Sequence, residues 1–130
     1  RPDAAPSPGD HAMTPSPRLA FEQEMAAADQ ARRAGRTADS FTHLERAHII
    51  GQRHSWRHAR SHLAMLRLGW AQRDWREVAG QMPRILAALV FSRLWVPRGN
   101  TGRARVSAFR PMPVPPDLAP LLERARTPQD

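Results

Sequence analysis

Hydrophobic residues recur at helical spacing along most of the chain between residues 19 and 96, with glycine or turn-forming residues at the breaks. This pattern predicts four main helices, over residues 19–34, 37–50, 55–72 and from about 74 to 90. Gly35 and Gly51 are expected to end the first two helices, and Asp74 to cap the fourth. Pro83 is expected to kink or divide the fourth helix. A last short helix is expected over residues 117–126.

The short connections between these helices favour antiparallel neighbours, so we expect an all-α fold of two stacked antiparallel helical hairpins. Spacings in the first hairpin recur in the second at a shift of 38 residues, which resembles the helix pairs of tetratricopeptide repeats. From Pro97 onward, repeated prolines predict an extended proline-rich C-terminal arm across the hairpins. The apolar stretch at 85–96, ILAALVFSRLWV, is too short to cross a bilayer, and we expect it to form a buried helix. The four tryptophans are expected to be packing anchors.

The ends of the chain differ in composition from its middle. Residues 1–17 hold five of the thirteen prolines and almost no apolar side chains, which predicts a disordered leader. We therefore expect a single helical domain over residues 18–126, including the arm, and a short tail at 127–130. Residues 1–17 contain no apolar stretch of the secretory type, and Met13 could be a translation start, so we expect a cytoplasmic protein.

Composition removes several classes of chemistry. The 130 residues contain no cysteine, and all 20 basic residues are arginine. Disulfides, thiolate metal sites, Schiff bases and the lysine of a phosphate-binding loop are thereby excluded. The net charge of +8 permits an anionic partner, but the chain has no nucleic-acid-reading motif, so nucleic acid is an unlikely partner.

Histidine is the most unusual feature of the chain. Five of its six histidines, at positions 43, 48, 54, 58 and 62, fall within twenty residues. Those at 54, 58 and 62 recur every four residues along one helix, a spacing at which two imidazoles can reach one metal ion. In the preceding helix, Glu45 and His48 have the Glu-x-x-His spacing of bundle metal sites. If the two helices pack antiparallel about position ~52.5, His48 faces His58 and His43 faces His62.

The favoured interpretation is a small metal-binding protein that acts as a carrier or sensor, with a histidine cluster at a helix–helix interface. The candidate ligands are Glu45, His48, His54, His58 and His62, and their donor types suit divalent zinc, nickel, cobalt, copper or iron. The alternative is a helical-repeat adaptor that binds another protein, in which the histidines are structural. A proton-sensing role is a third possibility.

The sequence does not indicate an enzyme. A di-iron carboxylate site needs a second Glu-x-x-His, but Gly80 occupies the place of its histidine after Glu77. No serine lies on a nucleophile elbow.

Three longer strings carry a family resemblance: HLERAHIIGQ at 43–52, MLRLGWAQRDWREV at 65–78 and VPRGNTGRARVSAFRPMPVPPDL at 96–118. From Phe21 to Leu122 the chain resembles the bacterial family labelled domain of unknown function 3703. That family has no established biochemistry to transfer. The resemblance implies that the proline-rich C-terminal segment belongs to the folded unit.

Overall fold

A computed structural model of the chain describes residues 15–92 and 94–126, and in this part of the chain all regular secondary structure is helical. The leader predicted over residues 1–17 and the tail predicted over residues 127–130 lie largely outside the described residues. The helices are α1 (Pro17–Arg33), α2 (Thr37–Gly51), α3 (Ser55–Ala71), α4 (Trp75–Phe91) and α5 (Ala119–Arg124). The predicted all-α fold and its pairs of packed helices are confirmed.

The N-termini of α1 and α4 are capped by side chains. Ser16 accepts a hydrogen bond from the Leu19 amide and Pro17 occupies the first turn, so α1 begins two residues before the predicted start. Asp74 caps α4 through the Glu77 amide at 3.1 Å, as predicted. The predicted division at Pro83 does not occur, because α4 continues from Trp75 to Phe91 with Pro83 inside it.

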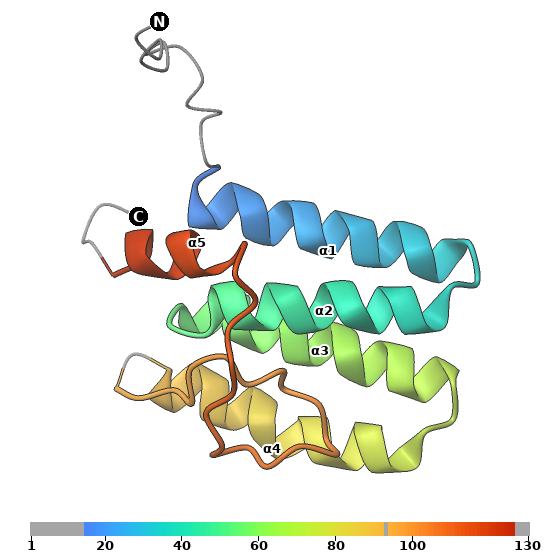
Figure 1. The fold of residues 1–130 in the computed structure, drawn as a ribbon. Helices are drawn as coiled ribbons and strands as arrows, with labels where there is room; N and C mark the ends of the chain where they lie inside the picture. Colours follow the sequence, from blue (N-terminus) through green and yellow to red (C-terminus); the bar gives the residue numbers. More distant parts are fainter. Residues whose placement is uncertain (1–14, 93, 127–130) are drawn as a thin grey trace, which may run out of the picture.

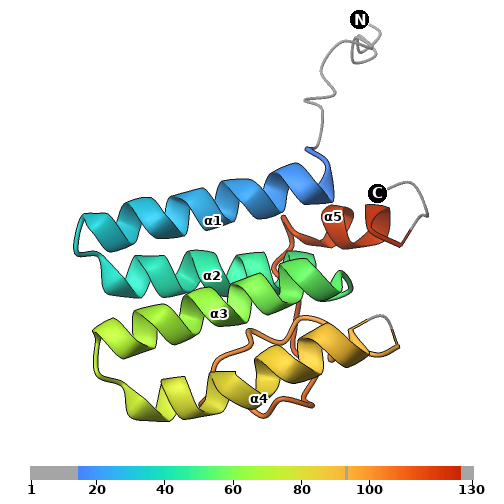
Figure 2. The ribbon, with the colours of Figure 1, turned by 180° about the vertical axis from the view of Figure 1, so that it is seen from behind.

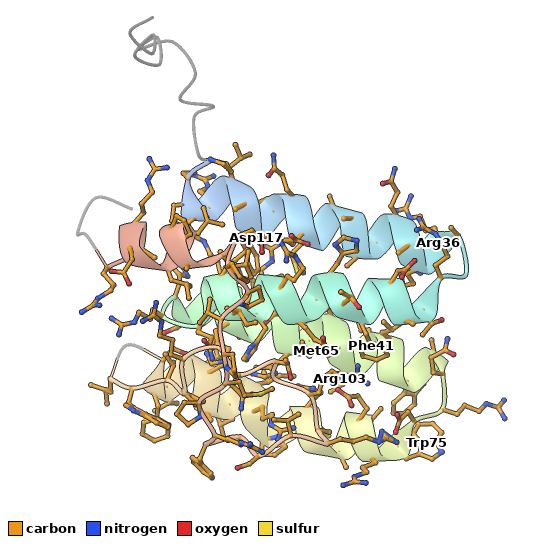
Figure 3. The ribbon with its side chains drawn as sticks, in the orientation of Figure 1. Arg36, Phe41, Met65, Trp75, Arg103 and Asp117 are labelled. Carbon is orange, nitrogen blue, oxygen red and sulfur yellow. The ribbon has the colours of Figure 1, made fainter. Side chains whose placement is uncertain are left out.

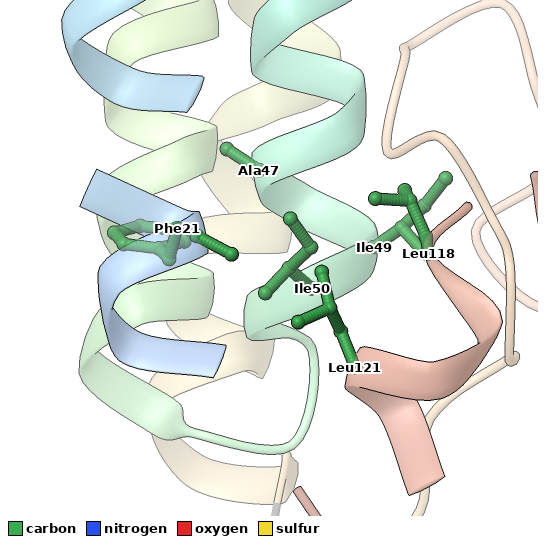
Figure 4. Packing of buried hydrophobic residues seen from close by; sticks show 7 residues of the cluster. Phe21, Ala47, Ile49, Ile50, Leu118 and Leu121 are labelled. Atoms are coloured by element: carbon green, nitrogen blue, oxygen red, sulfur yellow. The ribbon is translucent and has the colours of Figure 1, made fainter. Parts of the chain in front are cut away.

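The helices pack as two antiparallel pairs, α1 with α2 and α3 with α4, and α2 and α3 join the pairs (Figures 1 and 2). Phe21 is fully buried in a core that α5 covers through Leu118 and Leu121 (Figure 4). A second core joins α1, α2 and α3 around Phe41 and Met65. Burial of these side chains supplies the main stabilisation of the stack.

The segment between α4 and α5 crosses the α2–α4 side of the stack (Figure 1). Its buried centre is Asn100, whose Nδ2 donates to the carbonyls of Ser107 and Arg110, both at 2.7 Å. Arg103 reaches back to the carboxylates of Glu45 at 3.2 Å and Glu77 at 3.0 Å (Figure 3). These bonds fix the segment against α2 and α4 and so place Asn100 beside the histidine cluster.

The predicted burial of residues 85–96 and of the tryptophans is wrong. Leu86 is 65% exposed and Phe91 56%, and Trp56, Trp70, Trp75 and Trp95 are each more than half exposed. The physical reason is position, since α4 is an outer helix of the stack and, among the described helices, it packs mainly on α3. None of the helices in the described part of the chain is long and apolar enough to cross a membrane.

Candidate metal centre

Three histidines from two helices converge on one point. His48 lies near the end of α2, and His58 and His62 lie one turn apart on α3. Their Nε2 atoms form a small triangle, with 2.9 Å between His48 and His58, 3.1 Å between His58 and His62, and 3.2 Å between His48 and His62. Antiparallel packing of α2 and α3 about the turn at Gly51 produces this meeting, as the spacing predicts for His48 and His58.

The outer nitrogen of each ring has a fixed acceptor. The Nδ1 of His48 donates to the Asn100 carbonyl at 2.7 Å, because a carbonyl can only accept. The Nδ1 of His58 lies 2.7 Å from the Ser92 hydroxyl oxygen. That hydroxyl donates its own proton to the Ala88 carbonyl, so it accepts from His58. Both rings therefore carry their proton on Nδ1.

The third ring is held through Gln81 on α4. The Gln81 amide nitrogen donates to Glu77 at 2.8 Å and to the Gly102 carbonyl at 2.9 Å, which leaves its oxygen facing His62. That oxygen accepts from Nδ1 of His62 at 2.6 Å. Hydrogen bonds thus connect Glu77 to Gln81 and Gln81 to the His62 ring. Metal-binding histidines are typically oriented by hydrogen bonds of this kind to the ring nitrogen that does not bind the metal.

Burial keeps the three rings neutral. His48, His58 and His62 are 2%, 8% and 3% exposed. Desolvation lowers the pKa of His58 to about 4 and that of His62 to about 3, the latter with a contribution from neighbouring His58. The pKa of His48 is lowered well below its usual value, first by burial and then by the other two imidazoles.

These facts together leave three unprotonated nitrogens facing one another. With each proton on Nδ1, every Nε2 presents a lone pair to the centre of the triangle, and a hydrogen bond between them has no donor. Lone pairs at this separation repel unless a cation lies between them. The arrangement therefore has the chemistry of a ligand set, and these three side chains are the group of described residues that could hold a metal ion.

The triangle also has the right size. Three nitrogens at about 2.05 Å from one ion are about 2.9 Å apart at 90° and about 3.3 Å apart at tetrahedral angles. The observed separations of 2.9–3.2 Å fall in this interval. His48, His58 and His62 would therefore be able to hold one ion together and would leave part of its coordination sphere open.

The other predicted ligands lie elsewhere. Glu45 pairs with Arg103 at 3.2 Å, and burial raises the pKa of its carboxyl although Arg103 opposes this. His54 is exposed and caps α3, accepting from the Arg57 amide at 3.3 Å. The expected approach of His43 to His62 does not occur, because Nδ1 of His43 lies 2.7 Å from a Glu24 oxygen on α1. Of the five candidates, the structure brings His48, His58 and His62 together.

A cavity of about 620 Å³ opens on the triad. All three imidazoles line it, together with residues of α4 and of the following segment, and most of its walls are apolar. Arg84 is the charged side chain among its described lining residues. The triad thus forms part of the wall of a space large enough for a small organic molecule.

The supporting residues Asn100, Ser92 and Gln81 were missed by the sequence analysis. A single asparagine in a turn, or a serine at a helix end, has many ordinary roles, so none of them stands out alone. The turn at residues 99–102, with the sequence GNTG, was the available signal, because two glycines bracketing two polar residues indicate a tightly folded loop. Gly99 and Gly102 both adopt φ of 80° there.

The fold and the site define a class: a helical protein in which two paired hairpins enclose a buried histidine triad. A family model described as Protein of unknown function (DUF3703) matches residues 16–122. The chain therefore belongs to that family, as the resemblance in its sequence indicated. The match includes α1 to α4, the three histidines and the segment that carries Asn100. Comparisons with curated proteins and with solved structures found no match.

Proposed function

We propose that this protein binds one divalent transition-metal ion through the Nε2 atoms of His48, His58 and His62, and that it acts as a metal carrier or sensor. The observation that carries the proposal is the triangle of lone pairs without a proton between them. Neutral imidazoles suit zinc, cobalt, nickel, copper(II) and iron(II). Three ligands leave part of the coordination sphere open, which favours an ion that can be exchanged with a partner.

The sequence proposal of five ligands is narrowed to three. Glu45 is held by Arg103, and His54 lies at the exposed start of α3. The proposal therefore requires His48, His58 and His62 for metal binding. It does not require His43 or His54, which serve as matched controls.

The direct test is isothermal titration of the full chain with Zn²⁺ and Co²⁺ at neutral pH. We expect one ion per chain, and we expect His58→Ala and His62→Ala each to weaken binding at least about 100-fold, since loss of even a supporting residue costs 10–100-fold. His43→Ala and His54→Ala should bind as the wild type does.

Folding of the variants is checked by circular dichroism without metal. If a triad variant unfolds, His62→Gln keeps a polar side chain there, and its titration replaces that of the alanine variant. Unchanged affinity in a folded triad variant, or loss in the two controls, would remove the proposal.

A second candidate is the adaptor function, and the exposed apolar face of α4 favours it. Met82, Leu86, Leu89 and Val90 are all more than two-fifths exposed and repeat at helical spacing. In this case a protein partner covers α4 and the triad is structural. Leu86→Glu together with Val90→Glu should then abolish capture of that partner without changing the melting temperature, whereas metal binding would be absent in the wild type.

A further inference from the structure

We infer that the cavity above the triad binds an apolar organic molecule with one anionic head, of the chemical class of a medium-chain carboxylate, whose head coordinates the bound metal. This inference rests on the proposed metal site and goes beyond it, because it assigns the open coordination positions to a ligand. Four features of the described residues support it.

The first feature is the direction of the open positions. His48, His58 and His62 all line the same cavity. Their Nδ1 sides are occupied by Asn100, Ser92 and Gln81. The cavity is therefore the side from which an exogenous donor could reach an ion held by the triad.

The second feature is charge. Three neutral imidazoles leave both positive charges of a divalent ion uncompensated, and a buried charge requires a counter-charge. No carboxylate stands among the described residues that line the cavity. The carboxylate that acts on Arg84 is Glu77, which does not line the cavity and whose Oε1 is engaged by Arg103 at 3.0 Å and Gln81 at 2.8 Å, while its buried Oε2 has no hydrogen-bond partner. A ligand with one anionic head would offset one of these positive charges.

The third feature is Arg84, the cationic residue of the wall. Its Nη2 donates to the Val106 carbonyl at 2.7 Å, while its buried Nη1 has no hydrogen-bond partner. The guanidinium lies near enough to the triad to lower the pKa of both His48 and His62. An anionic head on the metal would lie in the field of this cation and supply the counter-charge that Arg84 lacks in the cavity.

The fourth feature is the apolar body of the cavity. Beyond the triad the walls are formed by Ala87, Phe91, Leu94, Trp95 and Phe109. The volume of about 620 Å³ lies within the usual range for small-molecule sites. The triad with Arg84 beside mostly apolar walls matches an amphiphile with one charged head, and it does not match a sugar or a nucleotide, whose polar groups are spread along the molecule.

The test uses the full chain loaded with Co²⁺, whose visible absorption reports a change of ligand at the metal. Octanoate is titrated beside acetate, which has the head without the body, and octanol, which has the body without the charge. We expect octanoate to change the cobalt spectrum and to bind at least about tenfold more tightly than either control. Along the series hexanoate, octanoate and decanoate, affinity should rise by up to about fourfold for each added CH₂.

A pair of variants separates the cavity from the surface around it. Ala87 lines the cavity, whereas its neighbour Leu86 lies outside it and is exposed. Ala87→Trp should weaken octanoate binding at least about tenfold while metal affinity stays unchanged, and Leu86→Trp should leave both unchanged.

Failure of the inference and failure of the proposed function give different results. A chain that takes up no cobalt overturns both. A chain that binds cobalt but treats octanoate and acetate alike, or whose Ala87→Trp variant binds octanoate normally, overturns this inference and leaves the metal site standing.

Discussion

At the scale of single residues, the proposed metal centre depends on a glycine that supplies no ligand atom. Gly102 adopts φ of 80°, and a Cβ at this position would lie 2.7–2.9 Å from three ring atoms of His48. The His48 ring cannot move away without losing its hydrogen bond to the Asn100 carbonyl. We predict that Gly102→Ala lowers zinc affinity at least about tenfold, because it displaces a ligand and strains the backbone. Titration calorimetry measures this.

Gly35 provides the matched control for that substitution. It has φ of 74°, but a Cβ there meets no atom within 4 Å. Gly35→Ala should therefore cost about 1 kcal/mol of folding free energy through backbone strain alone. Its zinc affinity should equal that of the wild type, and equal losses in both variants would mean that strain, not contact with His48, explains the effect.

Gln81 is the residue whose outer-shell role can be tested most sharply. Its oxygen accepts from His62 at 2.6 Å, and its nitrogen is fixed by Glu77 and Gly102. Gln81→Leu has a similar size but cannot accept the His62 proton, so metal affinity should fall by about 10–100-fold. The exposed Gln23→Leu is the control. Normal binding by a folded Gln81→Leu variant would show that His62 is oriented by packing alone.

Residue positions were predictable from the sequence as far as chain geometry decides them. The turn at Gly51 places His48 opposite His58 whatever the details of packing, and their Nε2 atoms lie 2.9 Å apart. To predict whether His43 meets His62, the rotation of each helix about its own axis must be known. Core packing decides that rotation. His43 instead faces α1 and Glu24. Glu45 was assigned to the metal because the sequence alone does not reveal its actual partner, Arg103, which lies 58 residues away in the sequence.

At the scale of elements, the segment between α4 and α5 contributes directly to the candidate site. Asn100 holds it together through Ser107 and Arg110, and its carbonyl accepts the proton of His48. We predict that Asn100→Ala destabilises the protein by about 1–3 kcal/mol, because two partly buried hydrogen bonds from its Nδ2 are lost. Amide exchange should become faster across residues 97–112 first.

The control for this variant is Arg110→Ala, which removes the Arg110 side chain but keeps the backbone carbonyl that accepts from Asn100. Arg110 contributes its backbone carbonyl to Asn100, and its own side chain is exposed. Arg110→Ala should leave exchange and stability unchanged within about 0.5 kcal/mol. Protection in Asn100→Ala equal to that of the wild type would show that the segment is held by its ion pairs.

Helix boundaries were predictable from caps and breakers, but the burial of α4 was not. Its residues are apolar on more than one side, and periodicity alone cannot tell which side has a neighbour. The stack ends at α4, so Leu86 and Val90 face outward while Ala88 is buried. Sequence also could not show the cavity, because its walls come from α4 and from the segment after it, which meet only in the folded chain.

At the scale of the whole molecule, a metal ion would add a further link between the two packed pairs of helices. The triad bridges α2 and α3, and its supporting bonds reach α4 and the segment after it. Binding to the folded state alone stabilises by about 2.7 kcal/mol at 100 times the Kd. For a domain of this size we expect the melting temperature to rise by about 10 °C.

The measurement is thermal unfolding by circular dichroism with and without saturating zinc. His54→Ala should show the full rise, and His58→Ala should show none. A rise of the same size in both variants would place the stabilising ion outside the triad.

The pH dependence of the metal-free protein follows from the lowered pKa values. In the folded state His58 and His62 take up protons only near pH 4 and pH 3, whereas in the unfolded chain they do so near the usual value of 6.5. Below that value the unfolded state binds more protons, so stability falls as pH is lowered from about 6.5 toward 4. Above it, these groups contribute no slope. Urea unfolding from pH 8 to pH 5 measures this, and His58→Gln should show a smaller loss.

The same values separate this site from a cluster of exposed imidazoles. An exposed cluster releases its metal as pH falls through about 6.5, because protons compete for free rings. In the folded protein, competition for His58 begins only near its pKa of about 4. Bound metal should therefore be retained at pH 5.5, and its release at lower pH should coincide with unfolding, since the chain must open before the rings can be protonated. Equilibrium dialysis and circular dichroism on the same samples compare the two midpoints. Release near pH 6.5 from a protein that is still folded would mean that the ion binds at exposed histidines instead.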